Sequence, residues 1–132
     1  MFDLKTRVLI VDDMSTMRKI VTKVCKEIGF TDFQEAADGA QAFDIISHSN
    51  PPIGLIISDW NMPNSTGLDL LKRVRADSRF KKLPFILVTA EAEQSQILEA
   101  VKAGVDQYVV KPFNQETLKG KLELAHKKFL AR

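Results

Sequence analysis

The sequence predicts an α/β protein built around one doubly wound, parallel β-sheet. Short runs rich in Val and Ile alternate with stretches in which apolar residues recur at helical spacing, and this alternation is the pattern of βαβ units. Three of the runs, VLIV, LII and FILV, are apolar at almost every position, which is typical of strands covered by helices on both faces. The length of 132 residues corresponds to a single domain. We therefore expect five βα units around one sheet.

Five runs are the candidate strands, and their composition indicates where each lies in the sheet. The first, third and fourth runs are the most apolar and are expected in its middle. The second run, FQEAA, carries two polar residues and is expected nearer an edge. The predicted strands are Arg7 to Val11, Phe33 to Ala37, Ile53 to Ser58, Phe85 to Thr89 and Tyr108 to Val110.

A helix is expected after each strand. The first begins after a cap candidate, Ser15, and ends at Gly29. Within it we interpret Cys25, the only cysteine, as a buried core residue and not as a reactive thiol. The apolar stripe of this helix comprises Met17, Ile20, Val21, Val24, Cys25 and Ile28.

The other four helices are bounded by capping and helix-breaking residues. Asp38 is the N-cap candidate of the second helix, which stops before Pro51. Gly104 ends the fourth helix, and Asn114 caps the fifth. The predicted core-facing stripes are Ala42, Ile45 and Ile46 in the second helix, Leu68, Leu71 and Val74 in the third, Ile97, Leu98 and Val101 in the fourth, and Leu118, Leu122, Ala125 and Phe129 in the fifth.

Composition and charge exclude several classes of function. The formal net charge is only +2, so a nucleic-acid partner is not expected. One cysteine and two widely separated histidines do not have the spacing of a zinc site. The apolar run near the N-terminus is too short for an export signal or a membrane span. We therefore expect a cytoplasmic protein without membrane insertion.

Polar side chains follow four of the predicted strands. Asp12 and Asp13 come after the first strand, Asp59 after the third, Thr89 at the end of the fourth and Lys111 after the fifth. Because a doubly wound sheet binds its ligands at the carboxyl ends of its strands, we expect these five side chains to meet at one edge. Taken singly, each has an ordinary explanation as a cap, a turn residue or a solvated lysine.

The combination of these groups predicts phosphoryl chemistry. Three carboxylates in one cleft repel one another, and a hard divalent cation such as Mg²⁺ relieves that repulsion with the oxygen ligands it prefers. An aspartate beside such an ion can attack a phosphoryl group, while a lysine and a hydroxyl hold the transferred oxygens. The sequence therefore contains the groups needed to form an aspartyl phosphate.

The four motifs DD, D-W-N-M-P, T-A-E and K-P-F, each after a successive predicted strand, resemble those of the receiver domain of bacterial two-component response regulators. The resemblance covers essentially the whole chain. Within the family, DWNMP, the TAEA run and Tyr108 are more similar to the single-domain chemotaxis regulators. It implies a flavodoxin-like fold with strand order 2-1-3-4-5, and residues 1–132 as a receiver domain with no output domain.

The resemblance also implies a role for each residue of the site. Asp59 would accept a phosphoryl group from a histidine kinase. Asp13, Asp59 and the main-chain carbonyl of Asn61 would bind Mg²⁺ directly, and Asp12 would help through water. Trp60, the only tryptophan, would border this metal site together with Met62.

Other positions would contact the phosphoryl group or set its lifetime. Thr89 and Lys111 would contact its oxygens, and the Lys111–Pro112 bond is expected to be cis. Asn61 and Glu91 would control how fast the acyl phosphate hydrolyses, so that the chain is a phosphoacceptor with weak self-dephosphorylation and not a dedicated enzyme.

The expected output is a change in a partner-binding surface. The ring of Tyr108 would move inward when Thr89 shifts toward the phosphate, which alters the face formed by the fourth helix, fifth strand and fifth helix. The implied partner is the flagellar motor switch protein, with a phosphatase as a further partner, and the chain is expected to be a monomer. Glu93 and Gln94 stand where the best-known chemotaxis regulators have two lysines. The alternative is a phosphorelay intermediate or a regulator of a non-motor partner.

Two other classes of protein fit the sequence less well. A phosphohydrolase of the haloacid dehalogenase type needs a second acid two residues after its nucleophile, and here that residue is Asn61. A flavodoxin-like electron carrier needs a hydroxyl-rich phosphate loop after the first strand, where this chain has two carboxylates.

Overall fold

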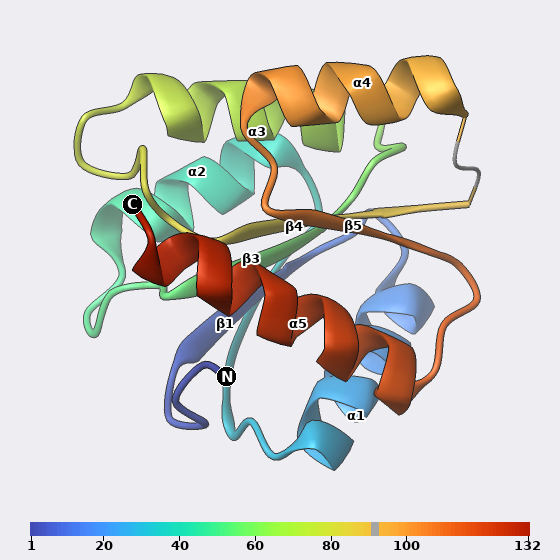
Figure 1. The fold of residues 1–132 in the computed structure, drawn as a ribbon. Helices are drawn as coiled ribbons and strands as arrows, with labels where there is room; N and C mark the ends of the chain where they lie inside the picture. The colour runs from blue at the N-terminus through green and yellow to red at the C-terminus, as the bar shows by residue number, and fades with distance from the viewer. Residues whose placement is uncertain (91–92) are drawn as a thin grey trace.

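The computed structural model describes residues 1–90 and 93–132 and contains one five-stranded parallel sheet. The strand order is β2-β1-β3-β4-β5, which confirms the predicted fold class and order. Figure 1 shows the central sheet with helices on both of its faces. The strands are β1 (Arg7–Val11), β2 (Asp32–Ala36), β3 (Leu55–Asp59), β4 (Phe85–Thr89) and β5 (Gln107–Val110).

The five helices divide between the two faces. In Figure 1, α1 and α5 lie on one side of the sheet, and α2, α3 and α4 lie on the other. The two faces carry separate apolar cores, and the residues of β1 alternate between them: Val8 and Ile10 point to the α1/α5 side, while Leu9 and Val11 point to the other. The helices are α1 (Ser15–Ile28), α2 (Gly39–His48), α3 (Gly67–Ala76), α4 (Gln94–Ala103) and α5 (Gln115–Leu130).

The predicted strands all lie close to the observed ones, but their bounds differ in accuracy. The bounds of β1 and β4 match the prediction, and β2 lies at the edge as expected, beginning at Asp32 and ending at Ala36, one residue earlier at each end. The predicted third strand began too early, at Ile53, because that residue is buried in the core without being part of the ladder. Asp59, placed after β3 by the sequence, is its last residue.

The helix caps confirm two predictions and correct a third. The side chains of Asp38 and Asn114 accept the backbone N–H of the third helical residue, as predicted for α2 and α5. Ser15 is not a cap but the first residue of α1, and Met14 holds the cap position without a side-chain hydrogen bond. The turn before α1 is instead closed by the Asp12 carboxylate, which accepts the Met14 N–H at 2.9 Å.

The predicted stripe of α4 is wrong at two positions. Leu98 and Val101 are 52% and 57% exposed, whereas Ala100 is fully buried. The helix meets the core at Ala100 and Ala103, and the small methyl side chain of Ala100 lets the helix approach the core closely. Ile97, the third residue of the predicted stripe, is half-buried.

Two further stripe residues are more exposed than predicted. Ile20 of α1 is 51% exposed, and it lines a pocket with Met17 and the segment that follows β5. Phe129, near the end of α5, is 37% exposed.

Cys25 is fully buried, as predicted, and burial raises the pKa of its thiol to about 12. Across residues 1–90 and 93–132, none of the helices combines the length and hydropathy of a membrane span.

Candidate functional site

Three carboxylates meet at the carboxyl ends of β1 and β3. These strands are neighbours, with Val11 opposite Ser58, so the residues that follow or end them lie side by side. One carboxylate oxygen from each of Asp12, Asp13 and Asp59 lies within 4.8 Å of the other two. Asp12 and Asp59 are 2% and 7% exposed, while Asp13 is open to solvent. The structure thus places the predicted acidic residues in one pocket.

Lys111 enters the same pocket from the segment after β5. Its Nζ lies 2.9 Å from Asp59 Oδ1 and 3.5 Å from Asp12 Oδ2. Its backbone N–H donates to the Thr89 carbonyl at 2.7 Å, which ties the lysine to the end of β4. The Lys111–Pro112 bond is cis, as predicted. One ammonium group is therefore in contact with two of the three carboxylates.

The charge balance of the pocket is suited to a cation. Burial, above all, raises the pKa of Asp12. The Asp59 and Asp13 carboxylates raise it further, while the Met14 N–H and Lys111 oppose the shift. Two of the three carboxylates, Asp12 and Asp59, contact the Lys111 ammonium, so negative charge remains in the pocket on hard oxygen donors. Asp12 and Asp59 are also shielded from water. This donor set fits a divalent cation that prefers oxygen ligands.

The predicted hydroxyl and aromatic residues lie on neighbouring strands. Thr89 ends β4 and is 4% exposed. Tyr108 is a half-buried residue of β5 that packs against the core beneath α2, α3 and α4. The Lys121 ammonium lies 4.7 Å from the centre of its ring, a contact that the sequence did not predict. Trp60 directly follows Asp59 and is buried in the same core as Met62.

The remaining predicted positions are distributed around this edge of the sheet. Asn61 is exposed, two residues after Asp59. Glu93 and Gln94 are exposed at the start of α4, where Glu93 holds the cap position without a side-chain hydrogen bond. The predicted role of Glu91 falls outside the described residues.

Two residues that support the site were missed by the sequence analysis. Gly67, the first residue of α3, donates its N–H to the Trp60 carbonyl at 2.8 Å and leaves no room for a side chain against the Asp59 backbone. Arg18 of α1 donates to the Asp12 carbonyl at 2.6 Å. The glycine in N-S-T-G-L-D, at the start of an apolar helix, was the available signal for the first. Nothing in the local pattern distinguished Arg18 from the other cations of its helix.

Comparisons with known proteins agree with this geometry. A family model described as the response regulator receiver domain matches residues 8–123. The chain is 50% identical to the chemotaxis protein CheY of Pseudomonas aeruginosa over 117 residues, which cover 89% of this chain and 93% of that protein. It is 48% identical to the chemotaxis protein CheY-3 of Vibrio cholerae over 117 residues, or 89% of this chain and 88% of that protein. The structure of the chemotaxis response regulator CheY4 of Vibrio cholerae matches with a TM-score of 0.81 and 34% identity, covering 92% of this chain and 98% of the other.

Proposed function

Because the chain belongs to the response regulator receiver domain family, we propose that its Asp59 is the phosphoacceptor of a signalling switch. The observation that supports this most strongly is the pocket itself, where the Asp59 carboxylate lies beside two further carboxylates and 2.9 Å from an ammonium group. An Asp59 oxygen attacks the phosphorus of a phosphodonor, the new O–P bond forms, and the bond from phosphorus to the donor breaks. The natural donor we propose is the phosphohistidine of a histidine kinase.

The proposed cofactor is Mg²⁺. Asp13, Asp59 and the Asn61 carbonyl would bind it directly, and Asp12 would contribute through water. When bound, the ion neutralises the charge that collects on the phosphoryl oxygens during transfer. Lys111 and Thr89 supply an ammonium and a hydroxyl to the same oxygens, which holds the group in place.

We expect Mg²⁺ to stabilise the folded protein and Asp13→Ala to reduce that effect. The ion binds the native pocket and not the unfolded chain, so at about 100 times its Kd it adds about 2.7 kcal/mol to the free energy of unfolding. Asp13→Ala removes a direct ligand, and we expect the Kd to rise at least about tenfold, since even groups that only orient ligands have effects of that size. Thermal melts over a Mg²⁺ titration measure both quantities.

The control for this experiment is Glu99→Gln, which removes an exposed carboxylate of α4 away from the pocket. It should keep the full Mg²⁺ response, and NaCl at matched ionic strength should not reproduce it. Loss of one repelling charge can raise the melting temperature of the Asp13 variant without Mg²⁺, so the shift caused by the ion is the quantity to compare. A wild-type melt that does not respond to saturating Mg²⁺ would contradict the proposed site.

The proposed output is regulation in chemotaxis. The relatives named above are chemotaxis proteins, and the face formed by α4, β5 and α5 carries Tyr108 with Lys121 over its ring. Phosphorylation at Asp59 would draw Thr89 toward the phosphate and favour an inward Tyr108 ring, which changes that face for its partner. The partner we propose is the flagellar motor switch protein, and a phosphorelay partner is the alternative because Glu93 and Gln94 alter the charge at the start of α4. Asn61 and Glu91 would set the lifetime of the signal.

Thr89→Ala should separate phosphorylation from its effect on the partner. For the wild type we expect phosphorylation to change partner affinity by about 5- to 150-fold, the usual range of allosteric coupling. For Thr89→Ala we expect nearly equal affinities with and without phosphate, because the hydroxyl that responds to the phosphate is missing. Binding to immobilised motor switch protein, and in parallel to a histidine phosphotransfer protein, tests the variant and the choice of partner. Intact mass must first show that the variant is phosphorylated; an undiminished change in its affinity would exclude coupling through Thr89.

A further inference from the structure

We propose that Arg18 is a positioning residue that fixes the Asp12–Asp13 segment for metal binding by tying it to the edge strand β2. The side chain of Arg18 makes two contacts at once. Its guanidinium donates to the Asp12 carbonyl at 2.6 Å and to Glu35 Oε1 of β2 at 3.1 Å. The inference rests on the proposed metal site and adds a residue that is not one of its ligands.

The segment after β1 is held to β2 through the backbone N–H and the backbone carbonyl of Asp12. The Asp12 N–H donates directly to the Ala36 carbonyl at 3.1 Å. The Asp12 carbonyl is held indirectly, through Arg18 to Glu35, the neighbour of Ala36. Because that carbonyl belongs to the peptide that leads into Asp13, fixing it sets the direction from which the Asp13 side chain leaves the backbone.

Asp13 depends on this main-chain restraint because its side chain has little else to hold it. It is exposed, and within residues 1–90 and 93–132 no hydrogen bond or ion pair reaches its carboxylate. Asp12 and Asp59 are different, since each is buried and paired with Lys111. Asp13 is therefore the ligand whose position is most sensitive to a change at Arg18.

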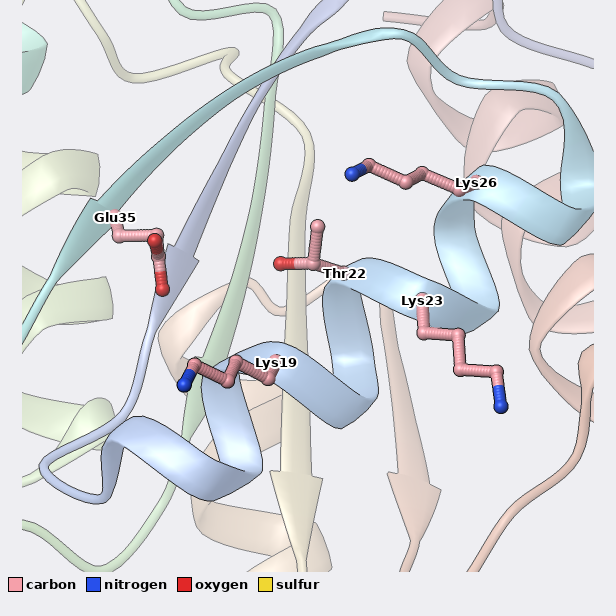
Figure 2. Close-up of a pocket in the computed structure, with 5 residues that line it drawn as sticks. All are labelled: Lys19, Thr22, Lys23, Lys26 and Glu35. Carbon is pink, nitrogen blue, oxygen red and sulfur yellow. The ribbon is translucent and has the colours of Figure 1, made fainter.

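The arrangement around Glu35 selects arginine over the lysines nearby. Figure 2 shows Glu35 projecting from β2 into the pocket between β2 and α1, where Lys19, Lys23 and Lys26 are on the helix side. Among the ion pairs of the described residues, Glu35 pairs with Arg18 and with none of these lysines. A planar guanidinium can donate to a carboxylate and a carbonyl at the same time with fixed geometry, whereas an ammonium is a compact point charge on a flexible stem. The link from the Asp12 carbonyl through Arg18 to Glu35, called the tether below, thus requires the guanidinium and not only its positive charge.

The first test compares Arg18→Lys with Lys19→Gln. Mg²⁺ titrations followed by the fluorescence of Trp60, the only tryptophan and the neighbour of Asp59, give the Kd for each variant. We expect Arg18→Lys, which keeps the charge, to raise the Kd about tenfold, as is usual for groups that orient metal ligands. Lys19→Gln removes a positive charge at the next position of α1 and should leave the Kd unchanged or lower it. A Kd for Arg18→Lys equal to that of the wild type would overturn the inference.

A double-mutant cycle distinguishes the tether from simple electrostatics and from a loss of stability. Glu35→Gln should raise the Kd in the wild type but have little further effect in Arg18→Gln, because the contact that it weakens is already gone. Equal effects of Glu35→Gln in both backgrounds would show that the two residues act independently and would refute the tether. The melting temperature of Glu35→Gln without Mg²⁺ should differ little from that of the wild type. Glu35 is 52% exposed, and ion pairs with such an exposed partner add little stability. A wild type that does not bind Mg²⁺ would instead refute the proposed metal site.

Discussion

Asp59→Asn is expected to abolish covalent phosphorylation when the protein is treated with acetyl phosphate and Mg²⁺. The wild type should gain one labile phosphoryl group, visible as a single increment in intact mass. An amide oxygen in place of the carboxylate is a far weaker nucleophile, so the O–P bond does not form. The other carboxylates of the pocket are not expected to substitute, because Asp59 makes the shorter contact with the Lys111 ammonium, at 2.9 Å against 3.5 Å for Asp12.

Two controls define what this result means. Asp44→Asn removes an exposed carboxylate of α2 and should be labelled like the wild type. Lys111→Ala keeps the acceptor but removes its neighbouring cation, and it should retain slow labelling while losing the change in partner affinity. Equal labelling of Asp59→Asn and the wild type would exclude Asp59 as the acceptor, and peptide mapping would then identify the residue that carries the phosphate.

Much of the fold could be predicted because burial on both faces leaves a clear pattern. Strands β1 and β4 are buried along nearly their whole length, and their predicted bounds match. Strand β3 is buried at all five positions, but Ile53 just before it is buried too, so the predicted strand began too early. The prediction of the buried stripe of α4 was wrong because periodicity identifies apolar side chains but does not show which of them contact the core. In α4 the buried position belongs to Ala100, while Leu98 and Val101 point outward. Packing between α4 and its neighbouring elements decides which side chains are buried, and the local sequence does not carry this information.

The acidic site could be predicted because the ends of parallel strands must meet. The rule that ligands bind at the carboxyl edge of such a sheet was enough to predict that Asp12, Asp13 and Asp59 lie together. Arg18 and Gly67 could not be found in this way. Arg18 acts through Glu35, seventeen residues along the chain, and Gly67 acts through a close approach between α3 and β3. Both roles arise from contacts between separate elements, which periodicity cannot detect.

Gly67→Ala is expected to destabilise the protein strongly, although alanine is normally the better helix residue. A Cβ at position 67 would overlap the carbonyl oxygen of Asp59 and come within 2.9 Å of Leu87 Cδ2. The obstructing backbone cannot easily move, because β3 is hydrogen-bonded to β1 on one side and β4 on the other. We expect the free energy of unfolding to fall by about 3 kcal/mol, the upper part of the range for overpacked cores.

The matched control for this change is Gly120→Ala. Gly120 lies within α5, and a Cβ there would meet nothing within 4 Å, so helix propensity alone should raise the free energy of unfolding by about 1 kcal/mol. Urea unfolding of both variants therefore gives opposite signs for the same substitution. Because the displaced atoms belong to Asp59, Gly67→Ala should also slow labelling by acetyl phosphate under conditions where it is still folded, whereas Gly120→Ala should not. Stabilisation of Gly67→Ala to the extent seen for Gly120→Ala would show that α3 does not pack on the acceptor strand as closely as the structure indicates.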